Sequence, residues 1–407
     1  MTAHQASRVP DSPVPDSPVL ALTGAAVEYR RHGQRVRALD GVDLTVARGE
    51  IVGLVGESGC GKSTLARAAV GLVPLAAGTV TFEGQPVAPL GMRRRAGRLR
   101  GLQLVFQDPY ESLNPRRTVG DLIGDGVLLG GGGKAAARSR ALGLLDRVGL
   151  PRSAADGYPH EFSGGQRQRI AIARTLAAGP SCLIADEPIS ALDASAQAQI
   201  ANLLTALVRE EGIGLLLVSH DLSVVRQVAD RVAVMYLGRV VETGGTGGVW
   251  SGPAHPYTEA LVAAIPRADG GGVLPADLPG DVPDPASPPP GCRFHPRCPI
   301  ARDDCAVTEQ RLIPLPAIPQ PGTSLAGHAA ACHVRVPQAS SPPGTGDVAP
   351  ASSRPAPGAD LLCGWSTRTS STCLRGRCCP PGPSRFPPTA RSPRSPPPPR
   401  LACRPVT

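Results

Sequence analysis

The chain of 407 residues is long enough for two or three domains, and its apolar content of 41% is that of a water-soluble globular protein. Its net charge of +9 does not indicate a nucleic-acid-binding surface, because nine Arg and two Asp in residues 338–407 account for +7 of it. No apolar run approaches the roughly 18–20 residues that cross a bilayer, and residues 1–19 contain no apolar signal-peptide core. We therefore expect a cytoplasmic chain whose 11 Cys are reduced and whose membrane role depends on partner subunits.

The composition changes three times along the chain. Residues 1–19 alternate Pro, Asp and Ser, which predicts a disordered leader. Residues 20–250 alternate short apolar runs with helical patterns, which is typical of an α/β domain. Residues 251–337 are rich in Pro and Gly and contain a Cys cluster. Residues 338–407 lose all periodicity, which predicts a disordered tail rich in Pro and Arg.

Three apolar runs are predicted to be buried strands of the α/β domain: Ile51–Val55, Cys182–Ala185 and Leu215–Val218. A helix is expected to begin at Ser63. Another is expected before the third strand, where one helical face carries Ile200, Leu203, Leu204, Leu207 and Val208. Between about 113 and 160 the alternation breaks, and a stretch rich in Ala, Leu and Arg predicts an inserted helical subdomain.

A glycine-rich segment follows the first of these strands. Residues 56–64 have the sequence GESGCGKST between a strand and a helix, the context that a G-x-x-x-x-G-K-[ST] phosphate loop requires. Three glycines allow the backbone to curl, so that successive N–H groups face the β- and γ-phosphates of ATP. We expect Lys62 to reach the same phosphates and Ser63 to ligate Mg²⁺, and the following helix adds its positive dipole end. The flanking elements disfavour the alternative, a turn with a surface lysine.

Two carboxylates follow the strand Cys182–Ala185. If that strand ends beside the phosphate loop, Asp186 lies in the Mg²⁺ shell, usually through water. Glu187 is then placed to act as general base for the attacking water. Alone, two acidic residues at a strand end would more often cap a helix or lie on the surface. Together with a phosphate loop, they favour a site that hydrolyses ATP.

A second glycine-containing motif separates this chain from other ATPases. Residues 162–169, FSGGQRQR, resemble the signature sequence of ATP-binding-cassette (ABC) proteins, and a helix is expected over 170–178. The Ser163 hydroxyl and glycine N–H groups at a helix N-terminus form an anion site. The resemblance implies an ABC-type nucleotide-binding domain with a helical subdomain. It also implies that the signature of one cassette closes on ATP held by the other, so that two cassettes enclose two nucleotides.

Further segments match the ABC pattern in order. The resemblance implies that Gln107 senses Mg²⁺ and the attacking water, that His220 contacts the γ-phosphate, and that the loop ending at Asp193 joins the two nucleotide sites. Tyr29 is the candidate to stack on adenine, with an ordinary strand tyrosine as the alternative. The residues expected to bind nucleotide are Tyr29, Gly56, Glu57, Ser58, Gly59, Cys60, Gly61, Lys62, Ser63, Thr64, Ser163, Gly164, Gly165, Gln166, Asp186 and Asp193. Those expected to bind Mg²⁺ are Ser63, Gln107 and Asp186, and the expected catalytic residues are Gln107, Glu187 and His220.

Three segments narrow the resemblance to the ATPases of oligopeptide and dipeptide importers: residues 108–116 (DPYESLNPR), 255–261 (HPYTEAL) and 290–299 (PGCRFHPRCP). This resemblance implies that ATP hydrolysis powers the uptake of peptides or of nickel–peptide complexes. The implied partners are a second ATPase subunit, forming a heterodimer with this chain, two transmembrane permease subunits and an extracellular solute-binding protein. The chain is then peripheral on the cytoplasmic face of the plasma membrane, and no nucleic acid is expected as a partner.

Four Cys lie in the extension, namely Cys292, Cys298, Cys305 and Cys332. Four reduced thiolates can hold a metal centre in a segment that is too short to form its own core. In the family that the chain resembles, this segment is the one that ligates a [4Fe–4S] cluster, and we favour that cofactor. Zinc, with His295 or His333 among its ligands, and four unligated thiols are the alternatives.

Two other functions compete with the importer. The basic pI would suit an ABC ATPase that acts on nucleic acid or ribosomes, but such proteins usually carry coiled-coil arms, zinc modules or tandem cassettes. This sequence has one cassette and no long heptad run. A drug-exporter ATPase is the nearer alternative, and the segments 255–261 and 292–332 argue against it.

Overall fold

The computed structural model describes residues 17–31, 33–91, 96–108, 112–190, 192–265, 280–315 and 327–336. These residues belong to one compact unit, 1–344, and a second unit, 345–407, lies outside the described residues. Most of the predicted leader and all of the predicted tail therefore also lie outside them. Among the described helices, none combines the length and the apolar character needed to span a membrane.

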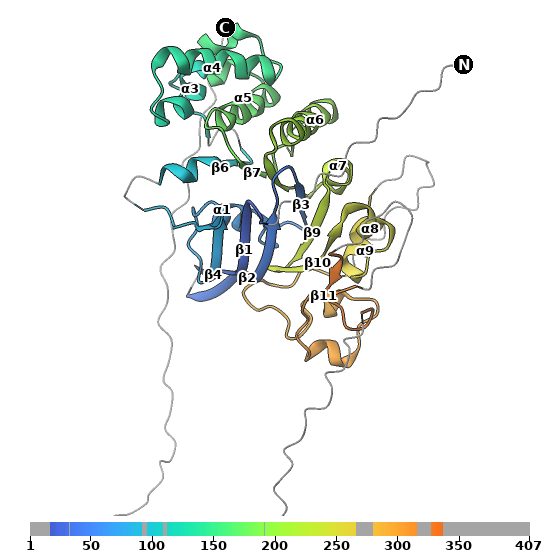
Figure 1. Cartoon of the computed structure of the whole chain (residues 1–407). Helices are drawn as coiled ribbons and strands as arrows, with labels where there is room; N and C mark the ends of the chain where they lie inside the picture. The colour runs from blue at the N-terminus through green and yellow to red at the C-terminus, as the bar shows by residue number, and fades with distance from the viewer. Residues whose placement is uncertain are drawn as a thin grey trace, which may run out of the picture. The chain divides into compact units, whose positions relative to one another are not determined.

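An antiparallel sheet opens the chain and contains β1 (Leu20–Arg31), β2 (Gln34–Val46), β4 (Ala77–Phe82) and β5 (Gln85–Pro86) in the order β2-β1-β4-β5 (Figure 1). In β2, Val42, Leu44 and Val46 are buried while the residues between them are exposed. Because side chains alternate between the two faces of a strand, this pattern places one face of the sheet on the core.

The main sheet has eight strands in the order β11-β12-β10-β9-β3-β8-β7-β6. Its strands are β3 (Ile51–Val55), β6 (Leu102–Val105), β7 (Cys182–Asp186), β8 (Gly214–Val218), β9 (Arg231–Tyr236), β10 (Arg239–Gly245), β11 (Ile313–Pro314) and β12 (Ala329–Ala330). The five from β9 to β6 are parallel, and β10, β11 and β12 pair antiparallel. Every residue of β3, β7 and β8 is buried, as continuous apolar runs predict for strands covered on both faces. The three predicted strands are confirmed.

Helices cover this sheet and form the helical subdomain. The α-helices are α1 (Lys62–Ala69), α3 (Val119–Leu129), α4 (Lys134–Arg147), α5 (Gly164–Leu176), α6 (Ala194–Glu211), α7 (Leu222–Val228), α8 (Thr246–Ser251) and α9 (Pro256–Ala263). Short 3₁₀ turns are η1 (Gly97–Gly101), η2 (Arg152–Asp156), η3 (Pro159–Glu161), η4 (His295–Arg297) and η5 (Asp303–Ala306). The face predicted for α6 is largely confirmed, since Ile200, Leu204 and Leu207 are buried.

The helical subdomain consists of α3 and α4, which pack on each other and on α5 (Figure 1). Its core includes Ile123 and Leu144, both essentially inaccessible to solvent. The expected helix over 170–178 was placed too late along the chain, because α5 already begins at Gly164. The cause is a capping box in which Ser163 and Gln166 satisfy each other's backbone N–H groups, so that the polar stretch after Ser163 forms the first turns.

The Cys-rich extension shares the core and the sheet of the preceding domain. Strand β12 pairs with β10, opposing Ala330 to Glu242. Phe294 is 1% exposed and packs edge-on against Tyr236 of β9 with ring centroids 5.3 Å apart, while Tyr257 of α9 lies beside both rings. The extension is therefore held by the buried apolar surface of the main domain, which compensates for its lack of a large core of its own.

Candidate active site

Four neighbouring parallel strands, β3, β8, β7 and β6, end at the same edge of the main sheet. The phosphate loop follows β3, and Glu187 follows β7 directly. Gln107 lies two residues after β6, and His220 lies two residues after β8. The carboxyl edge of a parallel sheet is where α/β proteins bind their ligands, so the topology brings the predicted residues together.

The backbone of the phosphate loop requires glycine at two positions. Gly56 has φ +151°, and a Cβ atom there would lie 2.1 Å from the carbonyl oxygen of Met235. Gly61 has φ +107°, and a Cβ atom there would lie 2.4 Å from the carbonyl oxygen of Ala38. Any side chain would clash with backbone at either point, so the loop can curl this tightly only with glycine.

Lys62 is held inside the phosphate loop. Its Nζ atom donates to the carbonyl oxygens of Gly56 at 2.7 Å and Glu57 at 2.9 Å, and the residue is 5% exposed. These bonds fix the Lys62 ammonium group within the loop that leads into α1. The arrangement suits a bound phosphate.

Ser63 and Asp186 place two oxygens side by side. The Ser63 hydroxyl donates to Oδ1 of Asp186 at 2.9 Å, and Asp186 is 2% exposed. Burial raises the pKa of Asp186, while the Ser63 hydrogen bond and the charge of Arg67 oppose the rise. A buried carboxylate paired with a hydroxyl beside a phosphate loop is a donor set that suits a hard divalent cation such as Mg²⁺.

Glu187 contacts the two other predicted catalytic residues, Gln107 and His220. Its Oε2 atom accepts a hydrogen bond from Nε2 of Gln107 at 2.9 Å and lies 3.4 Å from Nδ1 of His220. Glu187 has φ +47°, a region that non-glycine residues seldom occupy. The carboxylate side chain is 16% exposed, so a water molecule can reach it. The geometry is that of an oriented base beside a phosphate site.

The signature motif lies elsewhere in the chain and is open to solvent. The Ser163 hydroxyl accepts the N–H of Gln166 at 3.4 Å, and Oε1 of Gln166 accepts the N–H of Ser163 at 2.9 Å. A Cβ atom on Gly164 would meet nothing within 4 Å. In Figure 1, α5 groups with α3 and α4, well apart from α1 and the phosphate loop. The two predicted phosphate-binding elements are therefore not brought together within one chain.

Three other predicted residues have ordinary structural settings. Asp193 caps α6 by accepting the N–H of Ala196 at 2.9 Å. Tyr29 lies in β1 and is 41% exposed, so its ring is accessible for stacking. Cys60 is 4% exposed, and burial raises the pKa of its thiol, which makes it a small packing residue of the loop rather than a reactive one.

Comparison with known proteins decides the family to which this site belongs. A family model described as ABC transporter matches residues 39–190, and a second, described as the C-terminal region of oligopeptide/dipeptide transporters, matches residues 241–305. A putative peptide import ATP-binding protein of Brucella ovis is 46% identical over 299 residues, which cover 73% of this chain and 94% of that protein. The chain belongs to the ATP-binding proteins of ABC transporters.

Other relatives and solved structures agree with this ABC assignment. The oligopeptide transport ATP-binding protein AppF of Bacillus subtilis is 44% identical over 311 residues, covering 75% of this chain and 92% of that protein. A dimeric, post-hydrolysis structure of the ATP-binding cassette MJ0796 with ADP and phosphate aligns with TM-score 0.52 and 30% identity, covering 56% of this chain and 98% of that one. The ABC cassette fold predicted from sequence is thus confirmed, and the chain is an ATPase.

The Cys-rich extension of the ABC protein gathers its four Cys. Cys292, Cys298, Cys305 and Cys332 line one small pocket together with His295 and His333. Burial, together with the nearby thiols of the other three Cys, raises the pKa of the Cys292 thiol to about 11. The Sγ atom of Cys305 lies 4.0 Å from Nε2 of His333. The sequence therefore predicted correctly which thiols come together.

Two contacts between the extension and the phosphate loop were not anticipated from the sequence. Arg297 forms an ion pair with Glu57, and the hydroxyl of Tyr257 accepts the N–H of the same residue. Both residues lie inside the segments 255–261 and 290–299, which the sequence marked as importer-like without assigning them a role. The signal available was their position in those motifs, and the partner could not be inferred because it lies 200 or more residues earlier.

Proposed function

We propose that this chain hydrolyses MgATP to drive the uptake of peptides through a membrane ABC importer. The observation that carries the proposal is the contact of Glu187 with Gln107 and His220 at the strand edge that also holds Lys62. The match to the oligopeptide/dipeptide transporter C-terminal region, and relatives named for peptide import, support peptides as the transported class.

In this proposal the phosphate loop and Lys62 bind the β- and γ-phosphates, and Tyr29 stacks on the adenine. Ser63, Asp186 and Gln107 would hold Mg²⁺, which neutralises charge on the transferred phosphate. Glu187 takes a proton from the attacking water as the new P–O bond forms and the bond to the β-phosphate oxygen breaks. His220 donates to the γ-phosphate and stabilises the charge that develops on it.

The second half of each nucleotide site comes from another cassette. The start of α5, next to Ser163 and Gly164, is an exposed helix N-terminus, and a helix N-terminus favours a bound anion. We propose that it contacts the γ-phosphate of ATP bound to a second ATPase subunit, as part of a heterodimer. Asp193 would then lie in the loop between the two nucleotides.

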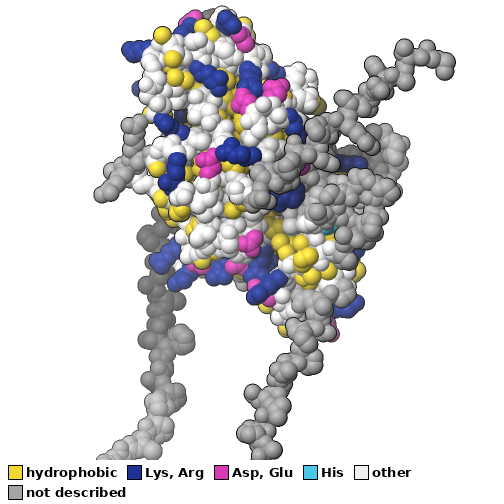
Figure 2. Space-filling view, in the orientation of Figure 1, with side chains coloured by type: hydrophobic (Ala, Val, Ile, Leu, Met, Phe, Trp, Pro, Cys, Tyr) yellow, Lys and Arg dark blue, Asp and Glu magenta, His cyan; other side chains and the backbone are white. Residues whose placement is uncertain are grey.

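The importer needs membrane partners. We propose two permease subunits, which the helical subdomain contacts from the cytoplasmic side, and an extracellular protein that delivers the peptide. On the face seen in Figure 2, Lys and Arg side chains are scattered among Asp and Glu side chains rather than joined in one basic track. This distribution supports a peripheral protein of the transporter over one that follows nucleic acid.

The four Cys of the extension would hold a [4Fe–4S] cluster, with Cys292, Cys298, Cys305 and Cys332 as ligands. These four Cys line one small pocket, and four thiolates are the ligand set of a [4Fe–4S] cluster. A structural zinc site can take four thiolates as well.

Zinc remains the alternative cofactor because Asp304, Cys305 and His333 have ligand atoms within 4.8 Å of one another. Metal analysis of anaerobically purified Cys298→Ser and His333→Ala variants separates the two. The cluster predicts that iron and sulfide fall in Cys298→Ser and persist in His333→Ala. Zinc that falls in His333→Ala, with no iron in the unsubstituted protein, would replace the cluster with a zinc site.

Reconstitution tests the function itself. The chain, assembled with its second ATPase and permeases in vesicles that contain the binding protein and peptide, should hydrolyse ATP faster than it does without peptide. The Glu187→Gln assembly is the matched control and should show no stimulation. Equal hydrolysis with and without a broad peptide mixture would reject peptides as the transported class.

A further inference from the structure

The phosphate loop of this chain contains an acidic residue. Glu57 lies at the second position of the loop, next to Gly56, where bound phosphate would concentrate negative charge. A carboxylate beside a triphosphate weakens its binding unless the carboxylate is neutralised or turned away. A partner that neutralises Glu57 or turns its carboxylate away would therefore favour ATP binding by this loop.

Arg297 supplies this compensation from the Cys-rich extension. Its two terminal nitrogens donate to the two carboxylate oxygens of Glu57 at 2.8 and 3.0 Å, a bidentate pair between residues 240 positions apart. Arg297 is 6% exposed, and the same guanidinium donates to the hydroxyl of Tyr236 at 3.4 Å. Two parallel, partly buried hydrogen bonds fix both the charge and the direction of the Glu57 side chain.

The backbone of Glu57 is held by the extension as well. Its N–H donates to the hydroxyl of Tyr257 at 2.8 Å, and Tyr257 is fully buried. The carbonyl oxygens of Gly56 and Glu57, on the two sides of the Glu57 Cα atom, accept from Nζ of Lys62. Tyr257 and Arg297 thus hold the backbone and side chain of the residue whose neighbouring carbonyl groups position Lys62.

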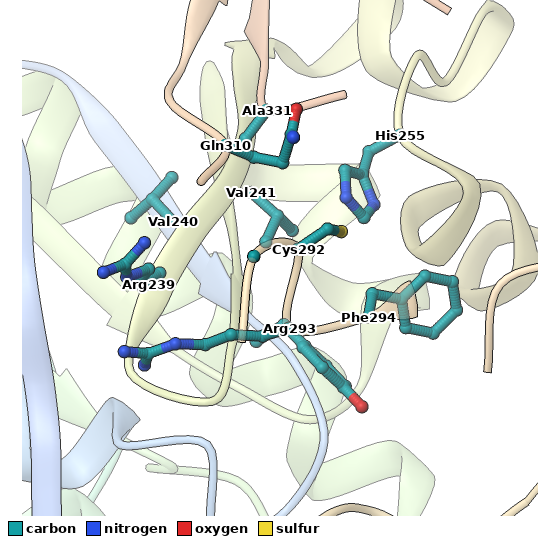
Figure 3. A pocket seen from close by; sticks show the side chains of 11 residues that line it. Arg239, Val240, Val241, His255, Cys292, Arg293, Phe294, Gln310 and Ala331 are labelled. Carbon is teal, nitrogen blue, oxygen red and sulfur yellow. The ribbon is translucent and has the colours of Figure 1, made fainter. Parts of the chain in front are cut away.

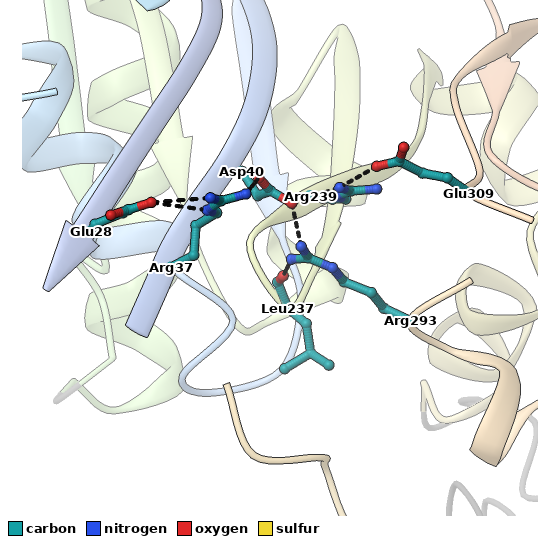
Figure 4. Close-up of polar contacts among 7 residues, drawn as sticks. All are labelled: Glu28, Arg37, Asp40, Leu237, Arg239, Arg293 and Glu309. Atoms are coloured by element: carbon teal, nitrogen blue, oxygen red, sulfur yellow. Dashed lines mark hydrogen bonds and ion pairs between the residues drawn. The ribbon is translucent and has the colours of Figure 1, made fainter. Parts of the chain in front are cut away.

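The segment that carries Arg297 is anchored at a second point. Arg293 donates to the carboxylate of Asp40 in β2 and to the carbonyl oxygen of Leu237, and Arg239 donates to the same carboxylate at 2.6 and 2.8 Å (Figure 4). Cys292, Arg293 and Phe294 line one pocket together (Figure 3). A shift of residues 292–298 would therefore break the contacts of Arg293 to Asp40 in β2 and to Leu237 directly after β9.

We propose that Arg297, with Tyr257, is a positioning residue of the nucleotide site, which neutralises and orients Glu57 so that Lys62 and the loop N–H groups can bind ATP. The inference rests on the proposed function and adds the extension as the structural support of the phosphate loop. The Cys-rich extension would then raise the affinity of the phosphate loop for ATP.

Equilibrium binding of MgATP to the full chain tests this role, together with the KM and kcat of its ATPase. Arg297→Met should weaken MgATP binding by about tenfold, because it leaves Glu57 charged and unpaired beside the phosphates. KM should rise more than kcat falls. Adding Glu57→Gln to Arg297→Met should restore most of the affinity, which a purely structural role of Arg297 does not predict. Arg335→Met is the matched control: it breaks an exposed pair with Glu259 in the same extension, and its affinity should stay unchanged.

Tyr257→Phe provides a second variant, since it keeps the buried ring and removes only the hydroxyl acceptor. It should weaken MgATP binding by about threefold to tenfold, with an unchanged thermal unfolding transition. An Arg297→Met chain that binds MgATP as tightly as the unsubstituted chain overturns the positioning role. So does a Glu57→Gln substitution that fails to restore binding to a folded Arg297→Met chain. Absence of MgATP binding by the unsubstituted chain would instead overturn the proposed function.

Discussion

The phosphate loop and the signature motif are both glycine-containing turns that open a helix, yet their surroundings differ. In the phosphate loop Lys62 is buried and hydrogen-bonded, and Glu57 is held by residues of the extension. In the signature motif the side chains of Ser163 and Gln166 accept each other's backbone N–H groups, and a Cβ atom on Gly164 would meet nothing within 4 Å. The phosphate loop is therefore held in place within the chain, whereas the signature motif is exposed to solvent. We call these two elements the half-sites of the nucleotide site.

This difference suggests separate roles for the phosphate loop and the signature motif in ATP binding and hydrolysis. A phosphate loop that is built into the sheet can bind ATP within a single chain. An exposed helix N-terminus separated from it contributes only when another molecule brings a phosphate to it. Hydrolysis should therefore need two cassettes, whereas binding should need one. The predictions below test whether the two half-sites separate in this way.

The largest effect is expected from Glu187→Gln. Glutamine keeps the hydrogen bond from Gln107 but cannot take a proton from water, so kcat should fall by about 10³-fold while MgATP binding persists. Phosphate release and equilibrium binding measured on the same preparation check this. Hydrolysis at the normal rate would remove Glu187 from the role of general base.

A smaller effect, on binding, is expected from Lys62→Ala. The substitution removes the charge that Gly56 and Glu57 hold in the loop, and MgATP affinity should fall by about 100-fold. Titration with a fluorescent ATP analogue measures the loss. Affinity within a few-fold of the unsubstituted chain would mean that the backbone alone binds the phosphates.

Gly164→Asp should have the opposite profile. A carboxylate fits there sterically and favours the N-terminus of α5, but it repels a phosphate brought by the other cassette. Binding to the single chain should change by less than about twofold, and turnover of the assembled pair should fall by about tenfold to 100-fold. If Gly164→Asp weakened MgATP binding to the isolated chain, the signature motif would contribute to binding within one chain, and the proposed separation of the two elements would be wrong.

The smallest effect concerns the stability of the extension behind the phosphate loop. Burial, opposed by Glu242 and aided by Arg335, lowers the pKa of His255 from 6.5 to about 4. The unfolded chain therefore binds the proton first, and stability should fall as pH drops below about 6.5, by about 2 kcal/mol at about pH 5. Urea unfolding at several pH values measures the slope, and His255→Asn, which keeps a cap acceptor for Tyr257, should flatten it.

The order of motifs in the sequence predicted most of this site, because each catalytic residue follows an apolar run that forms a parallel strand. Glu187, Gln107 and His220 meet since β7, β6 and β8 are neighbours. The local pattern could not indicate that Arg297 pairs with Glu57, because the sequence around an arginine carries no information about a partner 240 residues away. It also missed the start of α5, where a capping box turned a polar, glycine-containing stretch into helix.

The central claim is that ATP joins the phosphate loop of one cassette to the signature motif of another. Sedimentation of the Glu187→Gln chain with MgATP, together with the second ATPase of the transporter, tests it most directly. We expect a two-cassette species that forms only with ATP and is lost when Gly164→Asp and the equivalent substitution in the partner's signature motif are introduced together. ATP-bound chains that stay single, or that pair equally well with the altered signature, would contradict it.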